Sequence, residues 1–165
     1  MDEILGLTPR TYRLASTLID GSPRYIVQQK NNLAPTISLS IYEQFLSHNM
    51  GSHHSVRGSL DRLMYVYTWA QMEDIDLDML ILNSVALSPA QVRHFAHWLG
   101  NRNTQRGTEV SKISISNYNA ILSECSSMLC WFIRQYWAHS VGDLYDPQIR
   151  EFLTRRSRNQ TGCIL

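Results

Sequence analysis

The side chains in this sequence that are best suited to chemistry are arginines, and the chemistry they favour is binding to phosphate. Of the fifteen basic residues, thirteen are Arg and only Lys30 and Lys112 are Lys. The guanidinium group forms forked hydrogen bonds with phosphate and with guanine. The net charge is only +1, however, so composition by itself favours a mixed, solvated surface with no target.

Polar residues also stand where two helices are expected to begin. The first N–H groups of a helix have no partner within it, and together with the helix dipole they attract anions. Asparagine can in addition bond to adenine edges. The residues at these two positions are Ser55, Arg57, Ser114, Ser116, Asn117 and Asn119. For each serine, the alternative role is that of a plain N-cap.

Residue sets that could catalyse a reaction are incomplete. His54-Ser55-Val56-Arg57 has the form His-x-x-Arg, but it precedes a predicted helix and no strand-rich segment surrounds it. Tyr136 and Tyr145 lack the arginine pair and the lysine that would activate a tyrosine as a phosphoryl acceptor. The sequence contains no glycine-rich phosphate loop and no nucleophile elbow. We therefore expect no enzymatic activity and no cofactor.

The histidines and cysteines do not predict a metal site. His94 and His97 are three residues apart on one predicted helix, but a zinc site needs two further ligands at matched distances. Cys125 and Cys130 are five apart on another helix and point in different directions. With Cys163 they form no CxxC pair, and three cysteines suit a reducing cytoplasm rather than a disulfide scaffold.

Length and composition indicate a globular chain. With 165 residues, 44% hydrophobic and 18% charged, it can bury a core, and no apolar stretch is long enough for a membrane span or a secretory signal. Residues 13–19 and 24–29 predict two strands around a turn at Asp20-Gly21-Ser22-Pro23, and residues 34–40 have the composition of a third strand. The predicted domains are a β flap over 1–39, a helical domain over 40–140, and a linker with a final helix over 141–165.

The helical part begins near Ser40. Predicted helices cover 41–49, which ends at a link containing Gly51, and 55–69, with an N-cap near Ser55. Ser88-Pro89 predicts the start of a helix that stops at Gly100. The longest helix should follow a polar loop over 101–112, with an apolar stripe at 118, 122, 125, 129, 132 and 136. Asp146-Pro147 predicts a last helix over 147–158, whereas residues 79–87 fit either a strand or a short helix.

Helices in this order resemble the N-terminal core-binding (SAM-like) domain of tyrosine recombinases and phage-type integrases. The second helix of that family opens with Ser or Thr, has Arg two residues later and continues to a Trp, as Ser55, Arg57 and Trp69 do here. Its last helix opens with a Ser/Thr-Ile dipeptide, here Ser114-Ile115, and ends in an aromatic cluster, here around 131–137. The resemblance covers about residues 40–140, and it departs from the family pattern at Asn119, where an apolar residue is usual.

The resemblance implies a mainly α fold: a four-helix core-binding bundle with an N-terminal β flap and a C-terminal linker helix. It implies sequence-directed binding of double-stranded DNA, with protomers that assemble into dimers and tetramers on DNA, and with the catalytic domain elsewhere in a longer parent protein. The residues expected to contact DNA are Ser55, Arg57, Arg62, Arg102, Arg106, Lys112, Ser114, Ser116, Asn117 and Asn119. Of these, Arg102, Arg106 and Lys112 lie in the polar loop, where we expect mobile positive charge.

A second hypothesis is a helical module for protein–protein interaction. In that case an exposed apolar edge around Trp131 and Trp137 would dock a partner helix. Duplex binding that weakens as salt rises would distinguish the DNA-binding hypothesis from this one.

Overall fold

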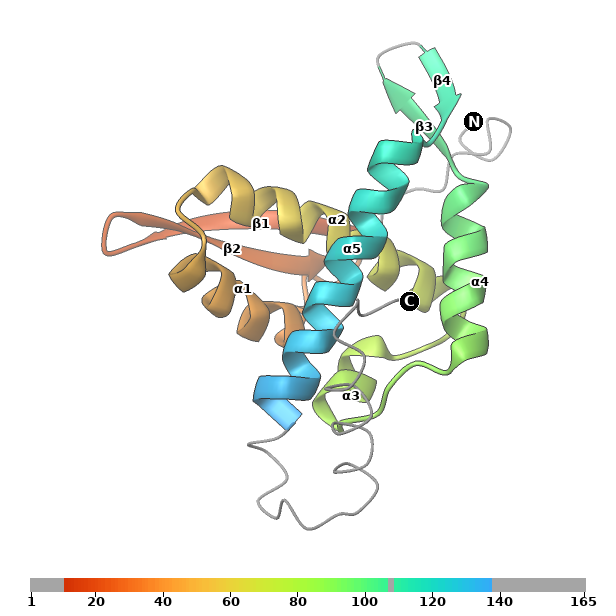
Figure 1. Cartoon of the computed structure of the whole chain (residues 1–165). Helices are drawn as coiled ribbons and strands as arrows, with labels where there is room; N and C mark the ends of the chain where they lie inside the picture. Colours follow the sequence, from red (N-terminus) through yellow and green to blue (C-terminus); the bar gives the residue numbers. More distant parts are fainter. Residues whose placement is uncertain (1–10, 107–108, 138–165) are drawn as a thin grey trace.

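The computed structural model describes residues 11–106 and 109–137, and this part of the chain is mainly helical, as predicted (Figure 1). Two strands, β1 (Tyr12–Ile19) and β2 (Ser22–Gln29), precede α1 (Ile37–Asn49), α2 (His53–Met72), α3 (Leu77–Leu82) and α4 (Pro89–Gly100). The strands β3 (Asn103–Arg106) and β4 (Glu109–Lys112) then lead to α5 (Ile115–Trp131), which continues into a π-helical stretch, Phe132–Trp137. The described residues thus contain five α-helices rather than the predicted four.

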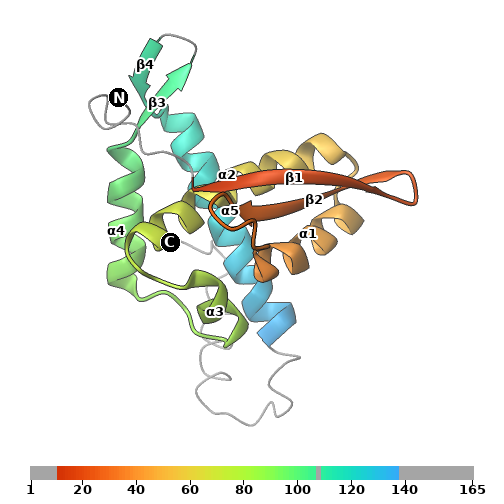
Figure 2. The same cartoon turned by 180° about the vertical axis from the view of Figure 1, so that it is seen from behind.

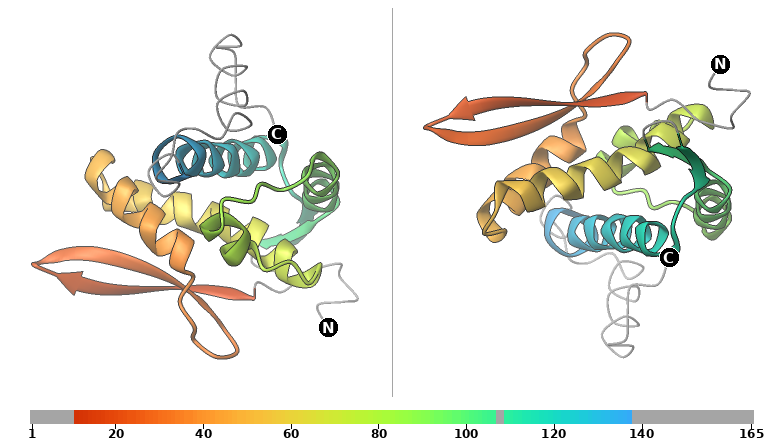
Figure 3. Two further views of the ribbon diagram at one scale, coloured as in Figure 1. Left: turned by 90° about the horizontal axis from the view of Figure 1, so that it is seen from below. Right: turned by 90° about the horizontal axis from the view of Figure 1, so that it is seen from above.

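The central element is α2, which contacts α1, α3, α4, α5 and both strands of the first hairpin. Seen along the vertical axis, α1 and α2 form a layer with the hairpin on one side and α5 on the other (Figure 3). The predicted apolar face of α2 is confirmed, because Val56, Leu60, Leu63 and Trp69 are all buried. From Leu63 to Ala70 every residue is buried, as expected for a helix covered on all sides.

The first hairpin forms as the sequence predicts. Its register pairs Tyr12 with Gln29 and Ile19 with Ser22, so that only Asp20 and Gly21 form the turn. Both turn residues have positive φ, 51° and 75°, which a type I′ turn requires. Tyr12 and Val27 belong to the same hydrophobic core as α2, and the hairpin is therefore packed onto the helical body.

The predicted third strand over residues 34–40 is wrong. Pro35 makes only a single bridge with Gln28, and α1 begins two residues later at Ile37. The carboxylate of Asp78 accepts hydrogen bonds from the backbone N–H groups of Ile37 and Ser38 at 3.0 and 2.8 Å, and from the Ser38 hydroxyl. This cap comes from a residue about forty positions away in sequence, so local composition could not reveal it.

The start of α4 is confirmed in detail. The Ser88 hydroxyl accepts a hydrogen bond from the Gln91 N–H, and the Gln91 side chain accepts one from the Ser88 N–H, which makes a capping box. Pro89 is the first helical residue and the helix ends at Gly100. Phe95 and Leu99 are buried, whereas Val92 and Ala96 are only half-buried.

The structure also shows what forms in the segment 79–87, which the sequence left open, and in the predicted polar loop 101–112. Residues 77–82 form the short helix α3, so the first part of the segment 79–87 is helical and residues 83–87 belong to neither a helix nor a strand. The predicted polar loop 101–112 is instead a second hairpin, in which Asn103 pairs with Lys112 and Arg106 with Glu109. Apart from Val110 this segment is polar, so it has no apolar alternation from which strands could be predicted.

In α5 the buried residues are spaced as the predicted apolar stripe, but the buried face of the helix is rotated relative to it. Cys125 and Phe132 are buried as expected, but Ile121 and Met128 are buried more completely than Tyr118, Leu122 and Leu129. At 20 residues α2 is also longer than α5, which has 17. Cys125 is a free thiol, whereas Cys130 is disulfide-bonded, a pairing that the cysteine count did not predict. Cysteine number alone does not determine pairing, which depends on distances in the folded chain.

The predicted helix over 147–158 and the linker 141–165 lie outside the described residues. Among the residues that are described, no helix is both long and apolar enough to cross a membrane.

Candidate nucleic-acid interface

The start of α5 is an exposed, polar helix end. Ser114 is the N-cap, and its hydroxyl accepts the Asn117 N–H at 3.2 Å. This confirms the plain capping role for Ser114, which leaves the N–H groups of Ile115 and Ser116 as first-turn donors without a partner inside the helix. The side chains of Ser116, Asn117 and Asn119 are all exposed, and Ile115 is 80% exposed. This helix end can therefore approach a phosphate without moving any side chain.

Lys112 lies next to this helix end. It is the last residue of β4 and its side chain is exposed. Across the hairpin its backbone pairs with Asn103, so the hairpin projects beside the start of α5 at one end of the molecule (Figure 1). The backbone of Arg106 pairs with Glu109 near the hairpin turn, but the side chain of Arg106 lies outside the described part of the structure. We call Lys112, Ser114, Ser116, Asn117 and Asn119 the α5 patch.

The start of α2 carries the other predicted residues, Ser55 and Arg57. The N-cap is Ser52 rather than Ser55, because α2 begins at His53. Ser55 is therefore the third helical residue, exposed and with no capping role. His53 and His54 beside it are exposed as well, and the His54-x-x-Arg57 segment forms the first turns of α2.

Two of the predicted arginines face carboxylates. Arg57 Nε lies 4.0 Å from Asp61 one turn further along α2, and its side chain remains 62% exposed. Arg62 Nη1 lies 3.8 Å from Glu124, which joins α2 to α5. The exposed Arg57–Asp61 pair holds its side chains only weakly, whereas the Glu124 side chain is only 14% exposed. Arg57 is thus available to an anion, while Arg62 has its charge partly balanced at the crossing of the two helices.

Arg102 is not the mobile charge that the sequence predicts. Only 7% of it is exposed, and its guanidinium lies 5.0 Å from the ring centre of Tyr65 and 5.1 Å from that of Trp98. Its backbone carbonyl accepts the Ile113 N–H, which closes the base of the second hairpin. Arg102 therefore anchors α4, the hairpin and α2 to one another through cation–π contacts, and it is removed from the DNA-contacting set.

The predicted residues form two separate groups. Along α5, Asn117 is about 10 Å from Glu124, and along α2, Ser55 is about 10 Å from Arg62, given the rise of an α-helix. Since Arg62 and Glu124 mark the crossing, the starts of the two helices diverge from it. The two groups can touch one duplex only at different phosphates.

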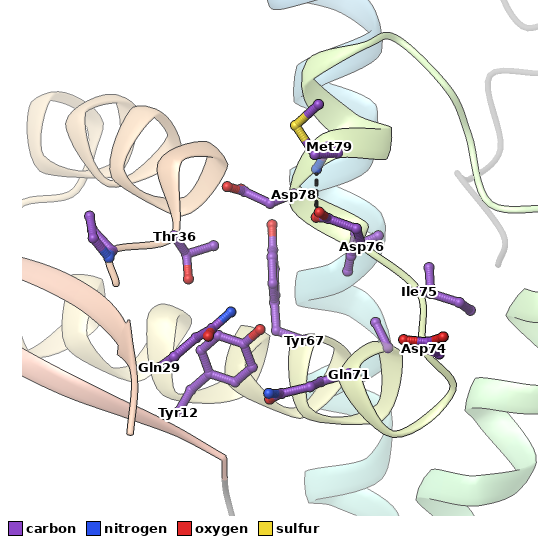
Figure 4. Close-up of a pocket in the computed structure, with 13 residues that line it drawn as sticks. Tyr12, Gln29, Thr36, Tyr67, Gln71, Asp74, Ile75, Asp76, Asp78 and Met79 are labelled. Atoms are coloured by element: carbon purple, nitrogen blue, oxygen red, sulfur yellow. Dashed lines mark hydrogen bonds between the residues drawn. The ribbon is translucent and has the colours of Figure 1, made fainter. Parts of the chain in front are cut away.

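A cavity of about 400 Å³ lies on another part of the molecule and was not expected from the sequence. It lies between β1, the end of α2 and the start of α3, and its wall includes Tyr12, Gln29, Tyr67, Asp74 and Asp76 (Figure 4). The sequence feature that coincides with it is a cluster of acidic residues over 73–78, three of which line the cavity.

The polar groups around this cavity already have structural roles. Asp76 caps α3 by accepting the Met79 N–H at 3.0 Å, and Asp78 caps α1. The Tyr67 hydroxyl is hydrogen-bonded to Ser38 at 2.6 Å. Burial, together with the nearby aspartates, raises the pKa of Tyr12 and of Tyr67, so both phenols stay protonated and act as neutral hydrogen-bonding groups. The two phenols are thus neutral groups in the cavity wall, and the carboxylates beside them are those of Asp74, Asp76 and Asp78.

The histidine and tryptophan hypotheses can also be compared with the structure. His94 Nδ1 lies 3.5 Å from Glu73, and no group of three or more metal-binding side chains occurs among the described residues. Trp131, at the apolar edge that the protein-interaction hypothesis proposes, is half-buried against Tyr42, Phe45 and Phe132. The side chains of Trp137 and Tyr136, and all of Tyr145, lie outside the described part.

Comparisons of this chain with protein-family models, with curated proteins and with solved structures found no match to any of them.

Proposed function

We propose that this chain binds double-stranded DNA and that the α5 patch makes the main contact. The observation that carries the proposal is the start of α5, where two first-turn N–H groups have no partner within the helix and Lys112, Ser116, Asn117 and Asn119 are exposed. Backbone N–H groups and small polar side chains at a helix start make many of the phosphate contacts in protein–DNA complexes. Arg57 at the start of α2 supplies a second, weaker contact.

The wider proposal follows from the resemblance to recombinase core-binding domains. In it, the helical body is a SAM-like DNA-binding domain without catalytic residues, it acts in the cytoplasm, and protomers assemble into dimers and tetramers on the duplex. The mainly helical fold and the crossing of α2 with α5 support this proposal. The proposed contact set is smaller than the sequence suggested, because Arg102 is buried and Arg62 faces Glu124.

The decisive experiment pairs two substitutions at equivalent helix positions. Ser116→Asp and Ala90→Asp each place a carboxylate at the second residue of a helix, α5 and α4 respectively. Both positions are exposed, and both changes should leave the fold intact, since an acid at a helix start is favourable. The start of α4 is far from the α5 patch: Tyr118 in α5 lies against Gly100, at the other end of α4 (Figure 1).

We expect the wild-type chain to bind a short mixed-sequence duplex with an affinity that falls linearly with salt on a logarithmic scale, because phosphate contacts release counterions. Ser116→Asp should weaken binding by about tenfold or more through repulsion of phosphate, and Ala90→Asp should leave it unchanged. Fluorescence anisotropy at several salt concentrations measures both. Absence of duplex binding at low salt, or equal effects of the two substitutions, would contradict the proposal.

A further inference from the structure

The two edges of the first hairpin differ in whether their outward backbone groups are hydrogen-bonded to other described residues. On β2, the outward backbone groups are covered: the Tyr25 N–H donates to Glu43, the Gln29 N–H to the Ala34 carbonyl, and the Val27 carbonyl accepts the Thr36 N–H. β2 lies between β1 and α1 (Figure 2), so α1 and the segment before it protect this edge. The opposite edge belongs to β1.

The backbone groups on the β1 edge can be identified from the register. A two-residue turn makes Ile19 and Ser22 a hydrogen-bonded pair, and at the other end the Lys30 N–H donates to the Thr11 carbonyl. The odd-numbered residues of β1 therefore bond to β2. Leu14, Ser16 and Leu18 direct their N–H and C=O groups outward, and no described residue bonds to these groups.

This edge carries none of the features that normally prevent strand pairing. Residues 14–19 contain no charge and no proline, and the register shows no bulge. Leu18 and Ile19 at the end of the strand are 72% and 51% exposed. A flat, uncharged edge with exposed apolar side chains is a template for another strand.

The sequence of the edge specifies which strand fits it. Leu14-Ala15-Ser16-Thr17-Leu18 has nearly the same residue sizes in both directions. In an antiparallel pairing about a two-fold axis at Ser16, Leu14 would face Leu18 of the second copy and Ala15 would face its Thr17. The hydrogen-bonded pairs would then be the outward residues 14, 16 and 18, as an antiparallel ladder requires.

The charges at the ends of this segment agree with the same arrangement. Arg13 and Asp20 are the only charged residues between 11 and 21. Pairing about Ser16 places Arg13 of each copy opposite Ile19 of the other and Asp20 opposite Tyr12, so no like charges face each other across the interface. The exposed Leu18 side chain would be covered by the half-buried Leu14 of the second copy.

We infer that β1 pairs with β1 of a second copy of this chain, which forms a continuous four-stranded antiparallel sheet across a two-fold axis at Ser16. Such an interface is isologous, with the same edge used by both copies. It does not involve the α5 patch, so it stands independently of the proposed DNA binding.

Sedimentation equilibrium of the full chain should show a dimer of twice 19.0 kDa that dissociates on dilution. Leu18→Lys should raise the dimer dissociation constant about tenfold or more, since lysines at a strand edge oppose pairing. Leu33→Lys is the matched control, because Leu33 is a 49% exposed leucine outside β1, and it should have no effect. A chain that is monomeric at its solubility limit, or a dimer that Leu18→Lys leaves intact, overturns the inference.

A cross-linking experiment locates the axis. The Cα atoms of a hydrogen-bonded antiparallel pair are about 5.5 Å apart, within the range a disulfide spans. Ser16→Cys should therefore form a disulfide-linked dimer under mild oxidation, above the wild-type background. Thr17→Cys should not, because residue 17 of each copy would face residue 15 of the other. Equal cross-linking of both variants overturns the pairing. Hydrogen exchange gives a second test: slowly exchanging amides at Leu14, Ser16 and Leu18 in a monomeric chain would show that another segment of the same chain covers the edge, which also overturns the pairing.

Discussion

Three arginines proposed from sequence to bind DNA have different surroundings in the fold. Arg57 is mostly exposed, Arg62 faces a carboxylate of another helix, and Arg102 is buried between two aromatic rings. The guanidinium group suits each role, because it binds anions in water and also stacks on aromatic faces when it is covered. Residue type alone therefore does not separate a ligand-binding arginine from a structural one.

The different surroundings of Arg102 and Arg57 predict that replacement by Ala lowers stability at Arg102 and DNA affinity at Arg57. Arg102→Ala should lower the free energy of unfolding by about 1–3 kcal/mol, because it removes two cation–π contacts and leaves a cavity. Its DNA affinity, measured well below its melting temperature, should stay that of the wild type. Arg57→Ala should change stability by no more than about 0.5 kcal/mol and weaken duplex binding similarly on all sequences. Chemical denaturation and anisotropy titrations of both variants provide the measurements. An Arg102→Ala protein with wild-type stability would contradict its assignment as an anchor.

At the scale of elements, helix starts were predictable where the cap is local. Ser88 and Ser114 accept hydrogen bonds from residues three positions later, and both helices begin where the sequence indicates. The start of α1 was missed because Asp78 caps it from α3. For α2, Ser52 has no side-chain hydrogen bond to the helix, so no capping signal distinguished it from Ser55.

An ion pair joins the first hairpin to α1. Arg24 donates to both Glu43 carboxylate oxygens, at 2.9 Å and 2.6 Å, and the carboxylate is almost fully buried. Burial acts to raise the pKa of Glu43, but hydrogen bonds from Arg24, Ser47 and the Tyr25 N–H outweigh it and hold the pKa below its usual value of 4.5. The same hydrogen bonding raises the pKa of Arg24.

We predict that this ion pair makes stability depend on acidic pH. A carboxyl whose pKa is lower in the folded than in the unfolded chain stabilises the fold above the unfolded pKa, and this contribution is lost as pH falls through the folded pKa. Glu43→Gln should therefore cost about 1–3 kcal/mol at neutral pH, and the difference from wild type should shrink below about pH 4. Denaturation curves across this range test the prediction.

Asp20→Asn is the control, since it makes the same carboxyl-to-amide change in the exposed hairpin turn, where Asn-Gly is favourable. It should show no loss of stability at any pH. A pH-independent cost for Glu43→Gln would mean that the residue acts through packing rather than charge.

For the whole molecule, stability is centred on α2, which touches all the other described helices and the first hairpin. Leu63 in its middle is fully buried, so Leu63→Ala should lower the free energy of unfolding by about 2–5 kcal/mol. Because both sides of the fold share this core, Trp fluorescence and far-UV circular dichroism should give one coincident transition. Leu33→Ala, at an exposed leucine, should stay within about 0.5 kcal/mol. Two separate transitions would show that the hairpin and the helices unfold independently.

The amino-acid sequence by itself determined the features that depend on neighbours along the chain. These are the hairpin around Asp20-Gly21, the buried face of α2, and the capped starts of α4 and α5. Each follows from side-chain periodicity or from a hydrogen bond that spans three or four residues.

Only the tertiary structure decided the features that depend on distant residues. Asp78 caps the start of α1 at residues where the sequence predicts a strand. Tyr65 and Trp98 pack against the guanidinium group of Arg102 and bury it. Glu43 and the segment before α1 covered one edge of the hairpin and left the other open. Desolvation, ion pairing and the protection of a strand edge depend on the distances between residues that are far apart in sequence. The pattern of residues along the chain does not contain these distances.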